Sequence, residues 1–529
     1  MVELGFLEAK NLSMYMKDRK LIDVTNLRLH EGNRIGLVGR NGSGKTTLMK
    51  ILAGEIVPET GHIVTDGTRH LLPQLKRTNT TKSGGEITQE YIDKALAKKA
   101  DIFFLDEPTT NLDTTRIEKL EKQLKKWKGI LVIVSHDRAF LDNICTKIWE
   151  LQDGKVSEYK GNYSDYYKQK QQEIRQQEQA YESYIKKKSQ LEEALELKEQ
   201  KAQRATKKPK QTSNSEAKIT GAKPYYANKQ KKLRKSAKAI ETRLEKLDKV
   251  EKVKEIPPIK MKLPNEEGTK GRIILRVEEV AGKVGDRLLW NNVSFQIRGG
   301  DKLAIIGPNG SGKTTLIKKI INQEDQIQSS PAMKIGYFSQ NLDVLDINKT
   351  ILENVSDTSS QDEALIRTVL ARLHFYREDV YKEIKVLSGG ERVKVAFAKL
   401  FVSNVNTIIL DEPTNFLDID AVEALEQLLT DYEGTVLFVS HDRRFIQEIA
   451  NRIIVFENHQ INLFEGTYAA YKNDTKKQKE DPFEQELIVL ETKITETLSK
   501  LSMEPTEALD QEFESLLARK KELESKRSN

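Results

Sequence analysis

A glycine-rich stretch that ends in a lysine and two threonines occurs twice in this chain of 529 residues. The first copy runs from Gly39 to Thr47 (GRNGSGKTT) and the second from Gly307 to Thr315 (GPNGSGKTT). Between a strand and a helix, such glycines let backbone N–H groups surround phosphates, while the lysine neutralises them and the next hydroxyl can hold Mg²⁺. Each copy follows an apolar run and precedes a helical pattern. We therefore expect two nucleoside triphosphate sites.

Acidic residues and a histidine follow each glycine-rich loop in the same order. Asp106 and Glu107 end one apolar run, and Asp411 and Glu412 end another. A carboxylate at the end of a buried strand suits Mg²⁺, and a second acid beside it can orient or deprotonate an attacking water. A histidine closes the next apolar run in each half, and we expect it to face the terminal phosphate. The predicted catalytic residues are Glu107, Glu412, His136 and His441.

A serine-glycine-glycine-glutamate motif lies between loop and acids in each half, at Ser83–Glu86 and Ser388–Glu391, and a glutamine precedes it. The ordered set resembles the ATPase domains of the ABC type. That resemblance implies ATP with Mg²⁺, and head-to-tail pairing that places each ATP between one half's glycine-rich loop and the other half's SGGE motif. The chain would then be a monomer with both ATP sites at its intramolecular interface, and both sites would hydrolyse ATP.

The resemblance carries over to this sequence residue by residue. It implies ATP contacts from Tyr15, Gly39, Asn41, Gly42, Gly44, Lys45, Thr46, Thr47, Gln74, Ser83, Gly84, Gly85, Gly307, Asn309, Gly310, Gly312, Lys313, Thr314, Thr315, Gln340, Ser388, Gly389 and Gly390. It implies Mg²⁺ ligands at Thr46, Gln74, Asp106, Thr314, Gln340 and Asp411. Tyr15 matches the aromatic residue that stacks on adenine, but a gapless alignment puts Lys283 opposite it, so what anchors adenine in the second half stays open.

The elements that must position these residues predict an α/β fold of two tandem P-loop ATPase domains, at residues 1–166 and 272–473. Apolar runs before each motif are the strands, and matching motif order indicates a duplication. Gln74 and Ser83 are nine positions apart, so we expect a reduced helical subdomain in the first domain. Gln340 and Ser388 are 48 apart, which leaves room for a fuller one.

Composition excludes several classes of protein. A single cysteine, Cys145, excludes disulfides and clusters of cysteine-bound metal. No run of 18 apolar residues is present, which predicts no membrane span, and the N-terminus has no secretory pattern. We expect a cytoplasmic protein.

Residues 167–256 between the two domains predict an antiparallel coiled-coil hairpin. Apolar residues recur at roughly heptad spacing in two charged segments, and Pro209, Gly221 and Pro224 fall between them. Residues 198–238 hold fourteen basic and two acidic residues, a charge of +12 against +7 for the whole chain. An inert spacer would not need this concentration of lysine, so the pattern favours a polyanionic partner, above all folded RNA.

Two such ATPase domains with a basic helical hairpin between them resemble the ABC-F family. The segments KEQKAQRATKKPK, GAKPYYANKQKKLRK, IGYFSQ and LSGGERVKVAF resemble its Vga-type antibiotic-resistance members from Gram-positive bacteria. The resemblance implies binding in the E site of the 70S ribosome, with the hairpin tip near rRNA and P-site tRNA, and displacement of lincosamide, streptogramin A or pleuromutilin drugs. The implied contacts of the tip are Lys207, Lys208, Lys210, Gln211, Thr212, Ser213, Asn214, Ser215, Lys218, Lys223, Tyr225 and Tyr226.

Pro257, Pro258 and Pro264 are expected to end the second helix of the hairpin and to start a linker over residues 257–271. Residues 474–529 read as a C-terminal helical hairpin broken at Glu504-Pro505. This hairpin could help to hold the ribosome or pack on the ATPase core. Three alternative functions stay open: a housekeeping translation factor acting on tRNA, the ATPase of a drug exporter, and a DNA-repair or chromosome ATPase. The short Gln74–Ser83 interval favours resistance over the first, and the basic hairpin has no role in the second. The hairpin is also too short for the chromosome-spanning coiled coil that the third alternative would need.

Overall fold

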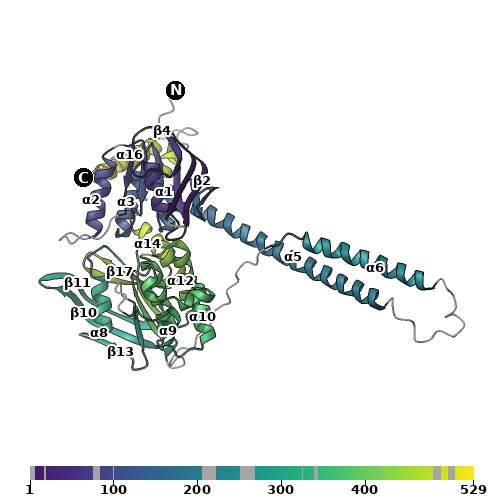
Figure 1. Cartoon of the computed structure of the whole chain (residues 1–529). Coiled ribbons are helices and arrows are strands. Elements are labelled where there is room, and N and C mark those ends of the chain that lie inside the picture. The colour runs from purple at the N-terminus through teal and green to yellow at the C-terminus, as the bar shows by residue number, and fades with distance from the viewer. Residues whose placement is uncertain are drawn as a thin grey trace. The chain divides into compact units, whose positions relative to one another are not determined.

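The computed structural model describes residues 6–16, 19–74, 84–98, 100–204, 222–250, 269–324, 326–338, 344–415, 417–479, 490–498 and 507–528. Contacts divide the chain into two compact units, drawn in Figure 1. The first unit comprises Met1–Gln74, Ala95–Pro108 and Gln123–Pro258, and the second comprises Leu75–Lys94, Thr109–Lys122 and Ile259–Asn529. Two short segments from the first half of the sequence therefore belong to the second unit.

A six-stranded sheet forms the centre of the first unit, in the order β5-β6-β7-β3-β8-β9. Its strands are β3 (Arg34–Val38), β5 (Arg69–Leu72), β6 (Ile102–Asp106), β7 (Ile130–Val134), β8 (Lys147–Gln152) and β9 (Lys155–Lys160). Neighbouring strands are parallel except for the β8–β9 hairpin. The strands β6 and β7 are buried throughout, which is why both are continuous apolar runs in the sequence.

An antiparallel sheet β2-β1-β4 completes the β structure of the first unit. It consists of β1 (Phe6–Met16), β2 (Arg19–His30) and β4 (Thr60–Asp66). The helices of the first half of the sequence before the hairpin are α1 (Lys45–Ala53), α2 (Gly84–Leu96), α3 (Thr114–Lys125) and α4 (Arg138–Ile144). Of these, α2 up to Lys94 and α3 up to Lys122 belong to the second unit.

The second unit repeats this architecture, with sheets β14-β15-β16-β12-β17-β18 and β11-β10-β13. Its strands are β10 (Ile273–Val284), β11 (Arg287–Arg298), β12 (Lys302–Ile306), β13 (Ile327–Ser329), β14 (Ile335–Phe338), β15 (Thr407–Asp411), β16 (Thr435–Val439), β17 (Arg452–Glu457) and β18 (Gln460–Glu465). Its helices include α8 (Lys313–Asn322), α12 (Ile419–Asp431), α13 (Arg443–Ile449) and α14 (Tyr468–Lys479). The matching strand order confirms the predicted duplication and the predicted α/β fold class.

In the second unit, a helical region lies between β14 and β15. It contains α9 (Ile351–Ser356), α10 (Glu363–Arg372), the 3-10 turns η2 (Arg377–Tyr381) and η3 (Ile384–Val386), and α11 (Gly389–Val402). The corresponding interval of the first half holds only α2 among its described residues.

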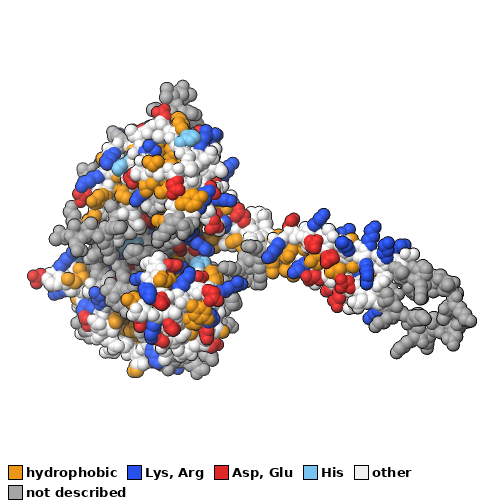
Figure 2. All heavy atoms as spheres, in the orientation of Figure 1, with side chains coloured by type: hydrophobic (Ala, Val, Ile, Leu, Met, Phe, Trp, Pro, Cys, Tyr) orange, Lys and Arg blue, Asp and Glu red, His pale blue; other side chains and the backbone are white. Residues whose placement is uncertain are grey.

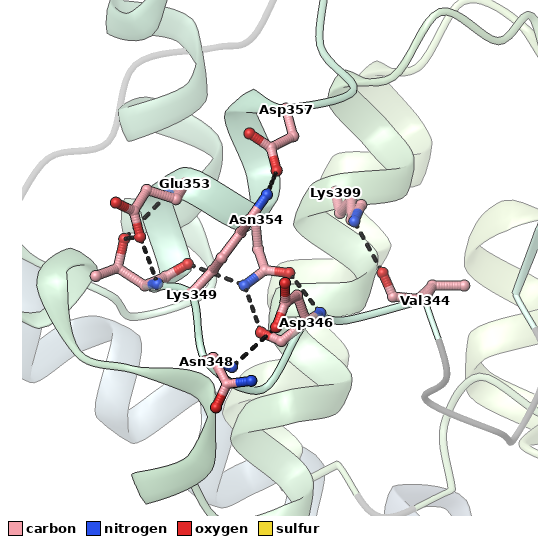
Figure 3. A network of polar contacts seen from close by, with 9 residues as sticks. Val344, Asp346, Asn348, Lys349, Glu353, Asn354, Asp357 and Lys399 are labelled. Atoms are coloured by element: carbon pink, nitrogen blue, oxygen red, sulfur yellow. Dashed lines mark hydrogen bonds and ion pairs between the residues drawn. The ribbon is translucent and has the colours of Figure 1, made fainter.

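The side chain of Asn354 holds the start of this helical region together (Figure 3). Asn354 is 1% exposed, and its Nδ2 donates to the carbonyls of Asp346 (2.9 Å) and Thr350 (3.1 Å). Its Oδ1 accepts from Asp346 N at 2.9 Å. Close by, Lys399 Nζ of α11 donates to Val344 O at 2.8 Å. These bonds tie the chain that follows β14 to both α9 and α11.

Two long helices of the first unit, α5 (Tyr163–Arg204) and α6 (Ala222–Glu245), lie side by side and extend from the sheet (Figure 1). The 42-residue α5 begins inside the segment that the sequence assigned to the first ATPase domain. Its first turn is anchored, since Tyr163 is buried and the backbone and hydroxyl of Ser164 both donate to Asp142 of α4, each at 2.6 Å. The hairpin is thus a continuous extension of the ATPase core.

The second hairpin helix ends earlier than the sequence suggested. We expected the prolines from Pro257 onward to end it, but α6 stops at Glu245 and the chain through Val250 is not helical. Asp248 and Val250 are weak helix formers, which accounts for an end before the prolines.

The C-terminal segment is helical at residues 490–498 and in α16 (Glu507–Ser528). An ion pair of 2.6 Å between Lys520 and Glu491 joins the two helical stretches. The predicted break at Glu504-Pro505 lies outside the described residues. Within the part of the chain that the structure describes, no helix has the length and apolar character needed to cross a membrane.

Candidate nucleotide sites

The glycine-rich loop of the first unit joins β3 to α1. Gly44 caps α1 with φ 105°, and Gly39 has φ 147°, where an added side chain would meet the carbonyl of Leu151 at 2.5 Å. Only glycine suits both positions. The buried Lys45 folds back over the loop, and its Nζ donates to the carbonyls of Gly39 (2.6 Å) and Arg40 (3.0 Å). The loop therefore holds a cation where phosphates are expected.

Two oxygen ligands suited to Mg²⁺ meet at the end of β6. Thr46 Oγ1 donates to Asp106 Oδ2 at 2.8 Å, and burial raises the pKa of Asp106 from its ordinary value. Among the described residues, no group of three or more His, Cys, Asp and Glu side chains could hold a metal by itself. Mg²⁺ commonly takes one or two protein oxygens and completes its shell with phosphates and water. The Thr46–Asp106 pair fits that mode.

Glu107, the residue after Asp106, forms a second pair with His136. Glu107 has the left-handed φ of 53°, and its N–H donates to the carbonyl of Val134 at the end of β7 (2.8 Å). His136 Nε2 lies 3.3 Å from Glu107 Oε1. Burial, with the Asp106 charge beside it, raises the pKa of Glu107 to about 8. A carboxyl group with a raised pKa in this position is suited to accept a proton from water.

The second unit reproduces this geometry with its own residues. Lys313 Nζ donates to the carbonyls of Gly307 (2.9 Å) and Pro308 (3.0 Å). His441 Nε2 lies 3.3 Å from Glu412 Oε1, and burial raises the pKa of Glu412 to about 8. Burial, with the Lys313 charge, lowers the pKa of His441 to about 3, so this imidazole is neutral at physiological pH. Asp411 likewise has a pKa raised by burial, and Thr314 hydrogen-bonds to it.

The two units differ where the adenine platform is expected. Tyr15 is 46% exposed near the end of β1, pairs with Lys20 of β2, and has the Lys20 ammonium 5.9 Å from its ring centre. In the equivalent hairpin of the second unit Lys283 pairs with Leu288, so the strand register agrees with the alignment that puts Lys283 opposite Tyr15. This position carries no aromatic ring in the second unit.

Asn111 and Asp113 lie near the glycine-rich loop of the second unit, and the sequence patterns did not predict them as site residues. Within the second unit, Asn309 Nδ2 donates to Asn111 O at 2.8 Å, and Asn309 N lies 3.4 Å from Asp113 Oδ2. Gly85 of the predicted SGGE motif is also here, since an added side chain would lie 2.9 Å from Asn309 Nδ2. The signal was available: an Asp follows the DEPT sequence at the same distance in both halves, at Asp113 and Asp418.

The other predicted site residues divide into described and undescribed ones. Gln74 is exposed at the end of β5, and Ser388 caps α11 in a reciprocal pair of bonds with Glu391. Ser83 and Gln340 lie outside the described residues, as do the predicted tip contacts from Lys207 to Lys218. For Gly84, Lys223, Tyr225 and Tyr226 the structure gives the backbone only, as part of α2 and α6.

Comparison with known proteins agrees with this geometry. A family model described as ABC transporter matches residues 22–81 and 290–415, and a second model with the same description matches residues 149–212. The ribosome protection protein VmlR of Bacillus subtilis (strain 168) is 33% identical to the chain over 549 residues, which cover 97% of each protein. The erythromycin resistance ATP-binding protein MsrA of Staphylococcus epidermidis is 34% identical over 83% of this chain and 94% of its own length.

Among solved structures, the protein named RNase-L Inhibitor resembles the chain with a TM-score of 0.58. The similarity covers 88% of this chain and 92% of the other at 19% sequence identity. At that identity the match shows a shared fold.

Proposed function

The chain belongs to the ABC-F family of ATPases, and from this premise we propose that it is a ribosome protection protein. With ATP bound, it occupies the E site of the 70S ribosome. The tip of the α5–α6 hairpin reaches past P-site tRNA toward the peptidyl-transferase centre. There it displaces lincosamide, streptogramin A or pleuromutilin drugs, and hydrolysis of ATP to ADP and phosphate releases the protein. Its place of action is the cytoplasm, on ribosomes.

The basic hairpin is the single observation that carries this proposal. Between Ala222 and Ile240, α6 contains no acidic residue. Its exposed basic side chains in this stretch include Lys231, Lys232, Arg234, Lys235 and Lys238. Figure 2 shows blue side chains gathered on the outer half of the hairpin. A positively charged rod attached to an ATPase core suits insertion into folded RNA, where lysine and arginine meet phosphates.

The names of two relatives support a role in ribosome protection and drug resistance. VmlR is named a ribosome protection protein, and its similarity spans both ATPase units and the hairpin between them. MsrA is named for erythromycin resistance, which is resistance to a drug.

Hydrolysis follows from the glutamate–histidine pair in each unit. Glu107 and Glu412 accept the proton of the attacking water, and His136 and His441 hold its position beside the terminal phosphate. Lys45 and Lys313 leave their loop carbonyls to contact phosphate oxygens. Mg²⁺, held beside Thr46 and Asp106, would neutralise charge that develops on the phosphates.

Replacement of both glutamates tests the proposal. In Glu107→Gln with Glu412→Gln, ATP still binds but the base is absent, so hydrolysis falls by about 10²-fold or more. Release then stops, and the variant should sediment with 70S ribosomes from a lysate supplied with ATP. The control is the same variant without ATP, which should remain in the supernatant. If the protein with ATP stays off ribosomes, the proposal fails.

A second arm of that experiment separates drug protection from a housekeeping role on tRNA. A strain that expresses the wild-type chain is compared with one that carries substitutions in residues 211–220, with growth measured on each class of drug. Altered resistance at unchanged ATPase activity supports protection. Ribosome binding without any resistance assigns the chain to the translation-factor alternative.

A further inference from the structure

Helix α3 touches the second nucleotide site at two places, although its residues come from the first half of the sequence. Just before its first residue, Thr114, the chain contacts the glycine-rich loop, since Asn111 and Asp113 bond to Asn309. About two turns further along, the carboxylate of Glu121 pairs with the guanidinium of Arg443. All of these residues belong to the second compact unit. The helix thus links the phosphate-binding loop to Arg443.

Arg443 stands directly beside the catalytic histidine of this site. It is the first residue of α13 and follows His441 by two positions. The turn between them is fixed, because Asp442 N donates to Ser440 Oγ at 3.1 Å and the Asp442 carboxylate caps α13 by accepting from Arg444 N and Phe445 N. A displacement of Arg443 is therefore transmitted through the Asp442 turn to the backbone of His441.

The Glu121–Arg443 pair is enclosed by the protein. The side chains of Arg443 and Glu121 are only 13% and 9% exposed. Loss of one partner of a buried ion pair has a larger effect than loss of an exposed one, because the remaining charge stays in a poorly solvated place. A neighbouring pair on the same helix, Glu118 with Lys472 of α14 at 3.0 Å, is far more open, with 42% and 37% of the side chains exposed.

We propose that the Glu121–Arg443 ion pair is a positioning contact for His441, through which helix α3 sets the catalytic geometry of the second nucleotide site. Binding of ATP phosphates to the loop at Asn309 fixes the start of α3, and Glu121 then fixes the His441 turn through Arg443. Neither residue touches ATP. The pair acts on the rate of hydrolysis and leaves the affinity for ATP unchanged.

The test measures kcat and KM for ATP in purified full-length protein without ribosomes. Glu121→Gln and Arg443→Gln should each slow the second site about tenfold, because a misplacement of about 1 Å costs up to about 10²-fold in rate. Because the first site is unaffected, kcat of the whole chain should fall about twofold, and KM should stay unchanged. Arg443→Lys keeps the charge and should recover part of the rate. The exchange Glu121→Arg with Arg443→Glu restores an ion pair, and should be faster than either single substitution.

Glu118→Gln is the matched control, since it removes an ion pair from the same helix without contact to the His441 turn. Its kcat should equal that of the wild type. Wild-type kcat in both Glu121→Gln and Arg443→Gln would overturn the proposal, and so would an equal loss in Glu118→Gln. If a single variant does not fold, Arg443→Lys and the exchanged pair still decide: a normal kcat in Arg443→Lys with no recovery in the exchange contradicts a charge-dependent contact.

This inference depends on the proposed function only in that the second site hydrolyses ATP. The two can fail separately, because the ATPase assay contains no ribosomes. A wild-type protein that hydrolyses ATP, responds to Glu121→Gln as expected and never binds ribosomes would refute ribosome protection and keep the positioning role.

Discussion

Glu107 and Glu412 are buried acids whose pKa values burial raises to about 8. A raised pKa means that the carboxylate, which is the form able to accept a proton, dominates only above about pH 8 in the protein without nucleotide. We expect kcat/KM for ATP hydrolysis to rise with pH from about 6 and to level off above about 8, since kcat/KM reports the free enzyme. Steady-state rates across this range check the expectation.

A solvated glutamate would give a different profile. With a pKa near 4.5 the rate would already be flat from about pH 6 upward. A flat profile would therefore contradict the raised pKa values of Glu107 and Glu412 in the working enzyme. Protein with both residues changed to Gln serves as the control, and its residual rate should lose the rise.

If Tyr15 stacks on adenine as proposed, the presence of Lys283 at the matching position would make the two nucleotide sites unequal. Loss of stacking on a base costs about 1–3 kcal/mol, so Tyr15→Ala should weaken ATP binding at one site by about 5- to 150-fold. Lys283→Ala should change affinity by less than about threefold, since no ring is lost. Titration calorimetry resolves the two sites, and Tyr15→Phe is the control that should bind as the wild type does. Equal losses in the two alanine variants would contradict an unequal pair.

At the scale of elements, the segment around α9 depends on one amide. Asn354→Ala removes three hydrogen bonds and leaves Asp346 N and two carbonyls without that partner in a buried place. We expect the free energy of unfolding of this domain to fall by about 1–3 kcal/mol. Scanning calorimetry should show a lower transition temperature for this domain. Asn348→Ala, at an exposed side chain, is the control and should melt as the wild type does.

The sequence predicted the elements that follow from local patterns. Buried parallel strands such as β6 and β7 are apolar runs, and the glycines of the loops are required by backbone geometry, so both were found. One contact between distant segments, between the SGGE motif of one half and the loop of the other, was expected from the family resemblance, but the other distant contacts were not. Glu121 and Arg443 are 322 positions apart, and each alone is an ordinary charged residue of a helix. The end of α6 at Glu245 was also missed, because prolines were the stronger signal.

At the scale of the whole molecule, duplication and charge distribution were both readable from the sequence. The two units carry the same strand order, and the basic surplus falls in the α5–α6 hairpin of the first unit. What the sequence could not predict is that Thr109–Lys122, a segment from the first half, belongs to the second compact unit. Such membership depends on tertiary packing, which leaves no local pattern.

Because the first turn of α5 is bonded to α4, a small rotation at this end of the helix displaces its far end by a larger distance. Its 42 residues form one continuous helix from the buried Tyr163 to Arg204. At about 1.5 Å per residue it spans about 63 Å, so a tilt of about 5° at Tyr163 moves the far end by about 5 Å, more than the thickness of a stacked base. A rotation too small to disturb the packing of the ATPase core therefore displaces the far end of α5 by a distance comparable to the size of a small-molecule drug.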